Sequence, residues 1–149
     1  MTAEFIFKVS YAGFFATYVH MLLGLWAPRV GLPKLDFARR MASLAFDNAY
    51  GGKPPYVLGL AILFVNGIFF AMLYAAVIGP LLPGTLMMRG FIFTGLLYLV
   101  AQCFFVPAIM HDGFFGLKNK EPTYVTVIIV YGAFGLVLGW LTPVLGVTD

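Results

Sequence analysis

Charged residues are scarce in this sequence. Of its 149 residues, 9 are Lys or Arg and 6 are Asp or Glu, so charged side chains make up 10% of the chain. Soluble domains average about 25%, and so few charges cannot cover a surface that faces water. Hydrophobic residues reach 62%. The composition therefore predicts an integral membrane protein whose main solvent is lipid.

Cysteine and catalytic motifs are also nearly missing. Cys103 is the only cysteine, which excludes an internal disulfide. The sequence has no nucleophile–base pair, no phosphate-binding loop, no Cys-x-x-Cys and no His-Glu-x-x-His. We therefore expect no catalysis from the isolated chain, and membership of an enzyme complex stays open. The basic residues form no patch for nucleic acid, which is not an expected partner.

Four long apolar runs contain no Lys, Arg, Asp or Glu. A helix needs about 20 mostly apolar residues to cross a bilayer, and these runs do not alternate in polarity as barrel strands do. Prolines lie in the breaks between the runs, where they disfavour a helical residue before them. We predict an all-α membrane protein, a single transmembrane domain built as a four-helix bundle. The predicted spans cover residues about 9–27, 56–79, 91–110 and 124–145.

The first loop is predicted to hold a short amphipathic helix over residues about 35–48. Asp36 is a suitable N-cap. Apolar residues recur at helical spacing beside two cations, and the interfacial set is Phe37, Met41 and Leu44 with Arg39 and Arg40. Two interpretations stay open, a helix lying in the lipid headgroup layer and a helix docked on a partner subunit.

Lys and Arg are distributed unevenly between the two sides of the predicted bundle. The first and third loops hold Arg29, Lys34, Arg39, Arg40, Lys53, Lys118 and Lys120, whereas the termini and the second loop hold Lys8 and Arg89. Cytoplasmic loops are enriched in Lys and Arg. We therefore predict that the first and third loops are cytoplasmic and that both termini lie outside.

Small residues recur along three of the spans, mostly at intervals of four. Helices in lipid associate largely through small residues, because these let two backbones approach closely. The residues predicted to pack helices are Ala12, Ala16 and Gly24 in the first span, Gly67, Ala71 and Ala75 in the second, and Gly135 and Gly139 in the fourth.

His20 lies inside the first span, on the same stripe as the small residues. An ionisable group at membrane depth is costly and usually faces the bundle interior. A neutral histidine that hydrogen-bonds a neighbouring helix is the main interpretation, and a haem ligand, a metal ligand or a proton relay is the alternative. His111, at the end of the third span, is a second candidate haem ligand. It should lie on the order of 10 Å nearer the surface, which suits an interfacial turn residue better.

Sulfur and amide side chains give two weaker hypotheses. The spacing of Cys103, Met110 and His111, by seven residues and then one, would put Cys103 and the His111 region on one face of the third span. Sulfur with imidazole suits copper, although Cys and Met are also ordinary packing residues. Asn66 and Gln102 lie near the middle of the second and third spans. They would make an interhelical amide contact or form a polar substrate site with His20. No cofactor is predicted firmly, haem and copper stay as alternatives, and bound lipids are expected.

Several short motifs resemble a group of small four-span proteins of the bacterial inner membrane. They are Gly31-Leu32-Pro33 before Asp36, Arg89-Gly90 at the third span, Ala101-Gln102 with Pro107 inside it, and Tyr131-Gly132 in the fourth span. The resemblance implies the four-span architecture and a location in the bacterial inner membrane. The group has no established activity, so the resemblance implies no role for any residue.

The sequence favours a non-catalytic accessory subunit of a larger membrane complex. Intramembrane chemistry is nearly absent, and the apolar surface is rich in aromatic residues. We expect an energy-transducing or electron-transfer assembly, respiratory or photosynthetic, with other integral membrane subunits and lipids as partners. Two alternatives stay open. One is a haem- or metal-binding membrane protein that uses His20, and the other is a small transporter or channel lined by Asn66, Gln102 and His20.

Overall fold

The computed structural model describes residues 2–109, 111, 113–118 and 123–147, and this part of the chain is helical without strands. Four helical stretches are long and apolar enough to span a membrane, which confirms the predicted four-helix membrane bundle. The spans are α1 (Ala3–Trp26) with η1 (Ala27–Val30), α3 (Tyr56–Leu73) with η2 (Tyr74–Ile78) and η3 (Gly79–Leu81), α4 (Leu86–Val100) with η4 (Ala101–Phe105) and α5 (Val106–Ala108), and α6 (Tyr124–Leu141). The first loop holds α2 (Phe37–Phe46) and the third holds η5 (Phe114–Gly116).

The first helix begins earlier than the apolar run that predicts it. Thr2 is the N-cap of α1, and its hydroxyl accepts a hydrogen bond from the Phe5 amide at 3.2 Å. One turn further on, Lys8 and Glu4 form an exposed ion pair of 2.7 Å at helical spacing. An N-cap and an ion pair of this spacing both stabilise a first helical turn. Helix α1 therefore extends beyond its apolar part.

Local capping also sets the bounds of the later spans. Helix α4 begins at Leu86 because the Thr85 hydroxyl accepts a hydrogen bond from the Met88 amide at 3.4 Å. Helix α6 ends at Leu141, and Thr142 is already extended. A proline follows Thr142 in the sequence, and it disfavours helical backbone at Thr142. The apolar run continues past this point, but the helix does not.

The helices pack in the spatial order α3, α1, α6, α4. In the α1–α3 and α4–α6 pairs, glycines let the two backbones approach closely. A Cβ atom added to Gly13 of α1 would lie 2.9 Å from the Gly67 carbonyl oxygen of α3, and one added to Gly90 of α4 would lie 2.8 Å from the Gly139 nitrogen of α6. The structure buries every small residue predicted to pack helices: Ala12, Ala16, Gly24, Gly67, Ala71, Ala75, Gly135 and Gly139.

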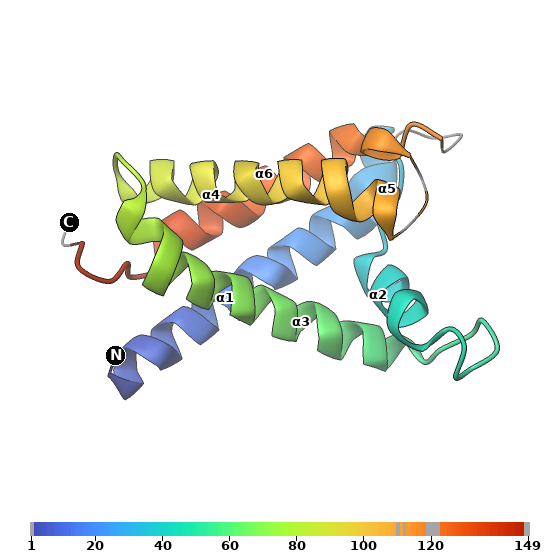
Figure 1. Ribbon diagram of the computed structural model, residues 1–149, viewed down its shortest axis with the longest axis horizontal. Coiled ribbons are helices and arrows are strands. Elements are labelled where there is room, and N and C mark those ends of the chain that lie inside the picture. The colour runs from blue at the N-terminus through green and yellow to red at the C-terminus, as the bar shows by residue number, and fades with distance from the viewer. Residues whose placement is uncertain (1, 110, 112, 119–122, 148–149) are drawn as a thin grey trace.

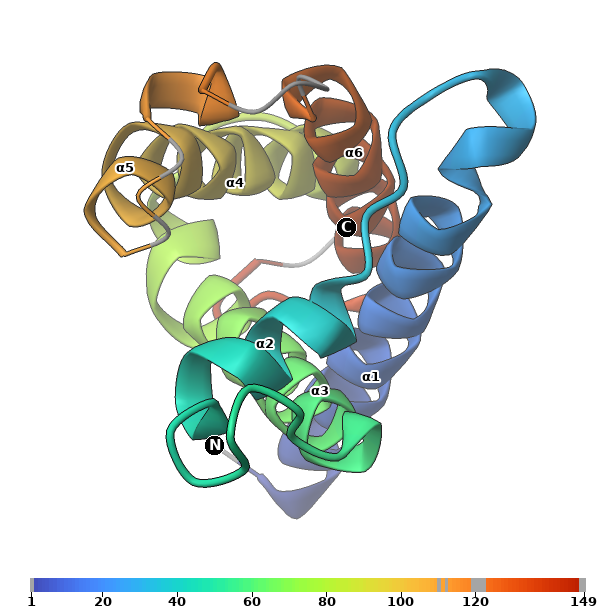
Figure 2. The same ribbon diagram turned by 90° about the vertical axis from the view of Figure 1, so that its right-hand side faces the viewer.

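Helices α3 and α4 follow each other in the sequence but do not pack closely against each other. They contact each other through η2 and η3, beside the loop that joins them, and they diverge away from that loop (Figure 1). Both marked chain ends lie at the same end of the bundle as this loop, while α2 and the third loop lie at the other end. Viewed along the bundle, the four spans surround a centre that α2 partly covers (Figure 2).

A π-helical segment ends the apolar part of the second span, just before a proline. The Gly79 amide donates to the Tyr74 carbonyl, five residues back. In this π register each carbonyl accepts from the amide five residues ahead. The Ala75 carbonyl would therefore need the amide of Pro80, which has no N–H group. The Leu145 amide instead donates to the Ala75 oxygen at 2.9 Å. The segment after α6 thus supplies the hydrogen bond that the proline cannot make.

The third span repeats this pattern at its own C-terminal end. The Val106 amide donates to the Ala101 carbonyl, and Pro107 follows directly. Proline clashes with the carbonyl four residues before it, and the wider π turn relieves the clash. Because a π turn adds a residue to the helix, it rotates every later side chain relative to the α-helical register.

Helix α2 docks on α3 of the same chain. Ala38 and Ala42 are fully buried, and Gly59 of α3 accommodates the Ala38 carbonyl. Asp36 caps the helix, as predicted, by accepting a hydrogen bond from the Arg39 amide at 3.0 Å. The apolar contact of α2 is therefore made within the chain.

The other interfacial residues of α2 lie around this contact. The Arg39 guanidinium lies 5.1 Å from the centre of the Tyr56 ring. Leu44 is exposed and Arg40 is half-buried. Phe37 and Met41 face the interior of the bundle. The outer face of α2 is therefore mixed, with one apolar side chain beside two cations.

Candidate functional site

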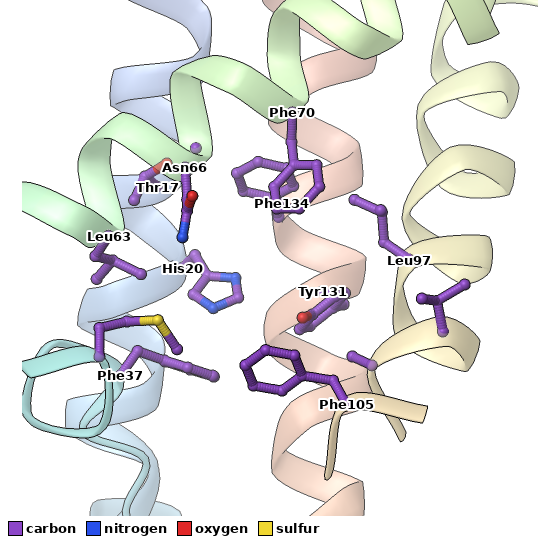
Figure 3. Close-up of a pocket in the computed structure, with 14 residues that line it drawn as sticks. Thr17, His20, Phe37, Leu63, Asn66, Phe70, Leu97, Phe105, Tyr131 and Phe134 are labelled. Carbon is purple, nitrogen blue, oxygen red and sulfur yellow. The ribbon is translucent and has the colours of Figure 1, made fainter. Parts of the chain in front are cut away.

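A cavity of about 260 Å³ lies inside the bundle, at the end nearer α2. All four spans and α2 contribute to its wall, so it exists only when the whole chain is folded. Its wall is mainly apolar (Figure 3). The lining residues are Thr17 and His20 from α1, Phe37 and Met41 from α2, Leu63, Asn66, Gly67 and Phe70 from α3, Leu97, Val100, Ala101 and Phe105 from α4 and η4, and Tyr131 and Phe134 from α6.

His20 is the polar centre of this cavity. Its side chain is 9% exposed and projects from the small-residue face of α1. Its ring centre lies 4.3 Å from that of Phe37, 5.4 Å from that of Tyr131 and 5.8 Å from that of Phe134. Within the described residues, no protein group hydrogen-bonds to the imidazole. The imidazole therefore faces the cavity, where a bound molecule can reach it.

Two further polar groups point toward His20. The Asn66 amide comes from α3 and the Tyr131 hydroxyl comes from α6 (Figure 3). Neither side chain hydrogen-bonds to another protein group in the described part of the chain. Thr17 differs, because its hydroxyl donates to the Gly13 carbonyl at 2.7 Å. The free polar groups of the cavity are therefore His20, Asn66 and Tyr131, which we call the polar trio.

The three side chains of the polar trio can both donate and accept hydrogen bonds without carrying a charge. A neutral imidazole, a primary amide and a phenol each offer a donor and an acceptor. The described lining contains no Asp, Glu, Lys or Arg. Such a site can hold a neutral group by several hydrogen bonds, and it offers no charge to balance an ion.

The structure separates residues that the sequence grouped together. His20 and Asn66 line the same cavity, whereas Gln102 is 3% exposed and is not part of the wall. Gln102 lies inside η4, where the π turn changes the direction of successive side chains. The cavity wall instead contains Ala101, directly before Gln102, and Phe105, three residues after it.

The residues considered for haem or copper do not form one group. His111 is exposed, lies outside the helices and has a positive φ of 57°, so it does not continue the face that carries Cys103. Cys103 is half-buried in η4. Met110 lies outside the described residues. Within the part that the structure describes, no cluster of His, Cys, Asp and Glu has the number of ligands a metal site needs.

The sequence did not predict that Tyr131 and Phe134 belong to a binding site. The signal in the sequence is weak, because Tyr131 and Phe134 are ordinary residues of an apolar span at a spacing of one helical turn. Only the packing of α6 against α1 brings them to His20. The spacing of residues within one span does not predict which other span it contacts.

No protein-family model, curated protein or solved structure matches the chain. The resemblance to small four-span bacterial proteins accordingly stays a prediction. The fold and the cavity define a multi-pass membrane protein of four helices with an uncharged polar site among its spans.

Proposed function

We propose that the chain binds a small uncharged molecule inside the membrane, with the polar trio as its hydrogen-bonding site. His20 carries this proposal, because a histidine at membrane depth is buried against a cavity and has no partner in the described chain. Polar groups inside the membrane are usually functional. A mainly apolar pocket with a few convergent polar groups is the usual form of a ligand site. A bound molecule would supply the missing hydrogen bonds.

The geometry favours binding of a small molecule over the other functions considered. Pockets that enclose drug-sized ligands measure about 300–1,000 Å³, and this cavity measures about 260 Å³. Haem is larger than most such ligands, so the cavity fits it poorly. A transport path lined by Asn66, Gln102 and His20 is not supported either, because Gln102 lies outside the wall.

The proposal predicts that a molecule co-purifies with the protein and depends on the polar trio. The protein is purified from its native membranes in lipid nanodiscs, and its bound molecules are extracted and identified by mass spectrometry. Asn66→Leu and Tyr131→Phe should each lower the bound amount about tenfold, because each removes one hydrogen bond of about 1.4 kcal/mol.

Tyr18→Phe is the matched control for this experiment. Tyr18 lies on α1 near His20 in the sequence but is exposed to the outside of the bundle. It makes the same chemical change as Tyr131→Phe and should leave the bound amount unchanged. Equal loss in both tyrosine variants, or a purified protein without any stoichiometric molecule, would refute the proposed function.

We propose the orientation from the distribution of basic residues. The first and third loops, with η1, α2 and η5, carry most of the Lys and Arg residues. They lie at one end of the bundle, opposite the marked chain ends. The positive-inside rule places that end in the cytoplasm. The cavity then lies in the cytoplasmic half of the bilayer.

The accessory-subunit role and the link to electron transfer stay predictions from the sequence. Exposed aromatic side chains such as Phe7, Phe69, Phe104 and Trp140 suit lipid tails and a neighbouring membrane subunit equally well. Purification in a mild detergent through a tag tests the role directly. Recovery with a fixed set of other membrane subunits would support it, and recovery of the chain alone would refute it.

A further inference from the structure

The cavity opens sideways between α3 and α4. Two of its lining residues are also exposed, Asn66 on α3 and Val100 on α4, and Val100 reaches 56% exposure. Because α3 packs on α1 and α4 packs on α6, the two spans leave this side uncovered away from their connecting loop. In a membrane, an opening between two spans faces the lipid tails.

The two ends of the cavity along the bundle are closed. At one end, α2 places Phe37 and Met41 in the wall and is fixed to α3 by its buried alanines. A hydrogen bond of 3.0 Å from the Leu35 amide to the Gly24 carbonyl ties the start of α2 to α1. At the other end lies a packed core, with Tyr74 and Leu138 fully buried. The lateral opening is thus the natural route to the polar trio.

Flat side chains dominate the wall around the polar trio. Four phenylalanine rings line it, from Phe37, Phe70, Phe105 and Phe134, and the rings of His20 and Tyr131 lie among them (Figure 3). Aromatic rings favour stacked or edge-to-face contact with another flat ring. Three uncharged side chains can meanwhile donate to carbonyl oxygens. The wall therefore suits a flat, neutral ring with carbonyl groups.

We infer that the ligand is a membrane-dissolved molecule of the quinone kind, which has a flat uncharged ring bearing carbonyl oxygens and a hydrocarbon tail. The ring lies among the aromatic residues and accepts hydrogen bonds from the polar trio. The tail leaves between α3 and α4 past Val100. This inference rests on the proposed binding function and adds the chemical class of the ligand and its route.

Three probes separate the contribution of the ring from that of the tail. Thermal unfolding of the purified protein is measured with a benzoquinone bearing a decyl tail, with the same benzoquinone without a tail, and with decanol. A ligand that binds the folded state raises the unfolding temperature. The tailed quinone should bind at least about tenfold more tightly than either of the other two, because it alone makes both kinds of contact.

Val100→Trp and Leu99→Trp test the lateral opening. Both residues are about equally exposed on α4, at 56% and 50%, but only Val100 lines the cavity. The larger ring at position 100 should weaken or slow binding of the tailed quinone several-fold, and Leu99→Trp should behave as the unchanged protein. Both variants should unfold at the same temperature without probe, because both positions face lipid.

The outcomes distinguish this inference from the proposed function. If Tyr131→Phe lowers the amount of a co-purified molecule, but the tailed quinone binds no better than decanol, the site is real and the quinone class is wrong. If the tailed quinone binds equally well to the unchanged protein and to Val100→Trp, the lateral route is wrong. If no probe binds and nothing co-purifies, both proposals are wrong.

Discussion

At the scale of single residues, His20 links stability to function. An unpartnered imidazole in an apolar wall costs free energy that a packing residue would not. Leucine has a similar volume and needs no hydrogen bond. The ligand-free protein should therefore tolerate His20→Leu, with a free energy of unfolding that is unchanged or higher by about 1–2 kcal/mol. The same change should abolish binding of the co-purified molecule.

Reversible unfolding in mild detergent, after removal of bound lipid, measures this effect. His111→Leu serves as the control, because His111 is exposed and lies outside the helices. It should change neither stability nor binding. A loss of more than about 1 kcal/mol for His20→Leu would instead identify His20 as a structural hydrogen-bonding residue, which was the main expectation from the sequence.

At the scale of helices, the crossing of α4 and α6 depends on the absence of side chains. A Cβ atom added at Gly90 would meet the Gly135 carbonyl and would lie 2.8 Å from the Gly139 nitrogen. Both groups are backbone atoms and cannot move aside without separating the helices. Gly90→Ala should therefore lower the free energy of unfolding by about 1–3 kcal/mol, as overpacking typically does.

Gly95 provides the matched control on the same helix. A Cβ atom added there has no other atom within 4 Å, and alanine is the better helix former. Gly95→Ala should leave the free energy of unfolding unchanged or raise it by up to about 1 kcal/mol. Equal effects of the two substitutions would show that the α4–α6 contact does not require Gly90.

The sequence predicts the elements of this fold better than it predicts the site. Long apolar runs decide where spans lie, and Asp36 marks the start of α2 because a side-chain cap is a local feature. The cavity depends on which spans touch, and on side-chain directions after a π turn. Gln102 illustrates the limit, because its place mid-span suggests a polar site with Asn66, while η4 turns it away from the cavity wall.

At the scale of the whole molecule, the distribution of basic residues predicts one orientation. In a Cys103→Ala background, Thr2→Cys places a thiol at the end near the chain termini, and Asn48→Cys places one beyond α2; both positions are exposed. A membrane-impermeant maleimide on intact cells should label Thr2→Cys, whereas Asn48→Cys should react only after lysis. Labelling of Asn48→Cys in intact cells would reverse the orientation and move the cavity to the outer half of the bilayer.

The hydrogen bond from Leu145 to the Ala75 carbonyl has a consequence for biosynthesis. The ribosome makes α3 long before it makes Leu145, so this hydrogen bond is absent when the second span enters the bilayer. An unpaired carbonyl in lipid is costly. In an α-helical register the Gly79 amide would serve this carbonyl, so the π turn and its hydrogen bond to Leu145 belong to the late steps of folding, after α6 has been translated.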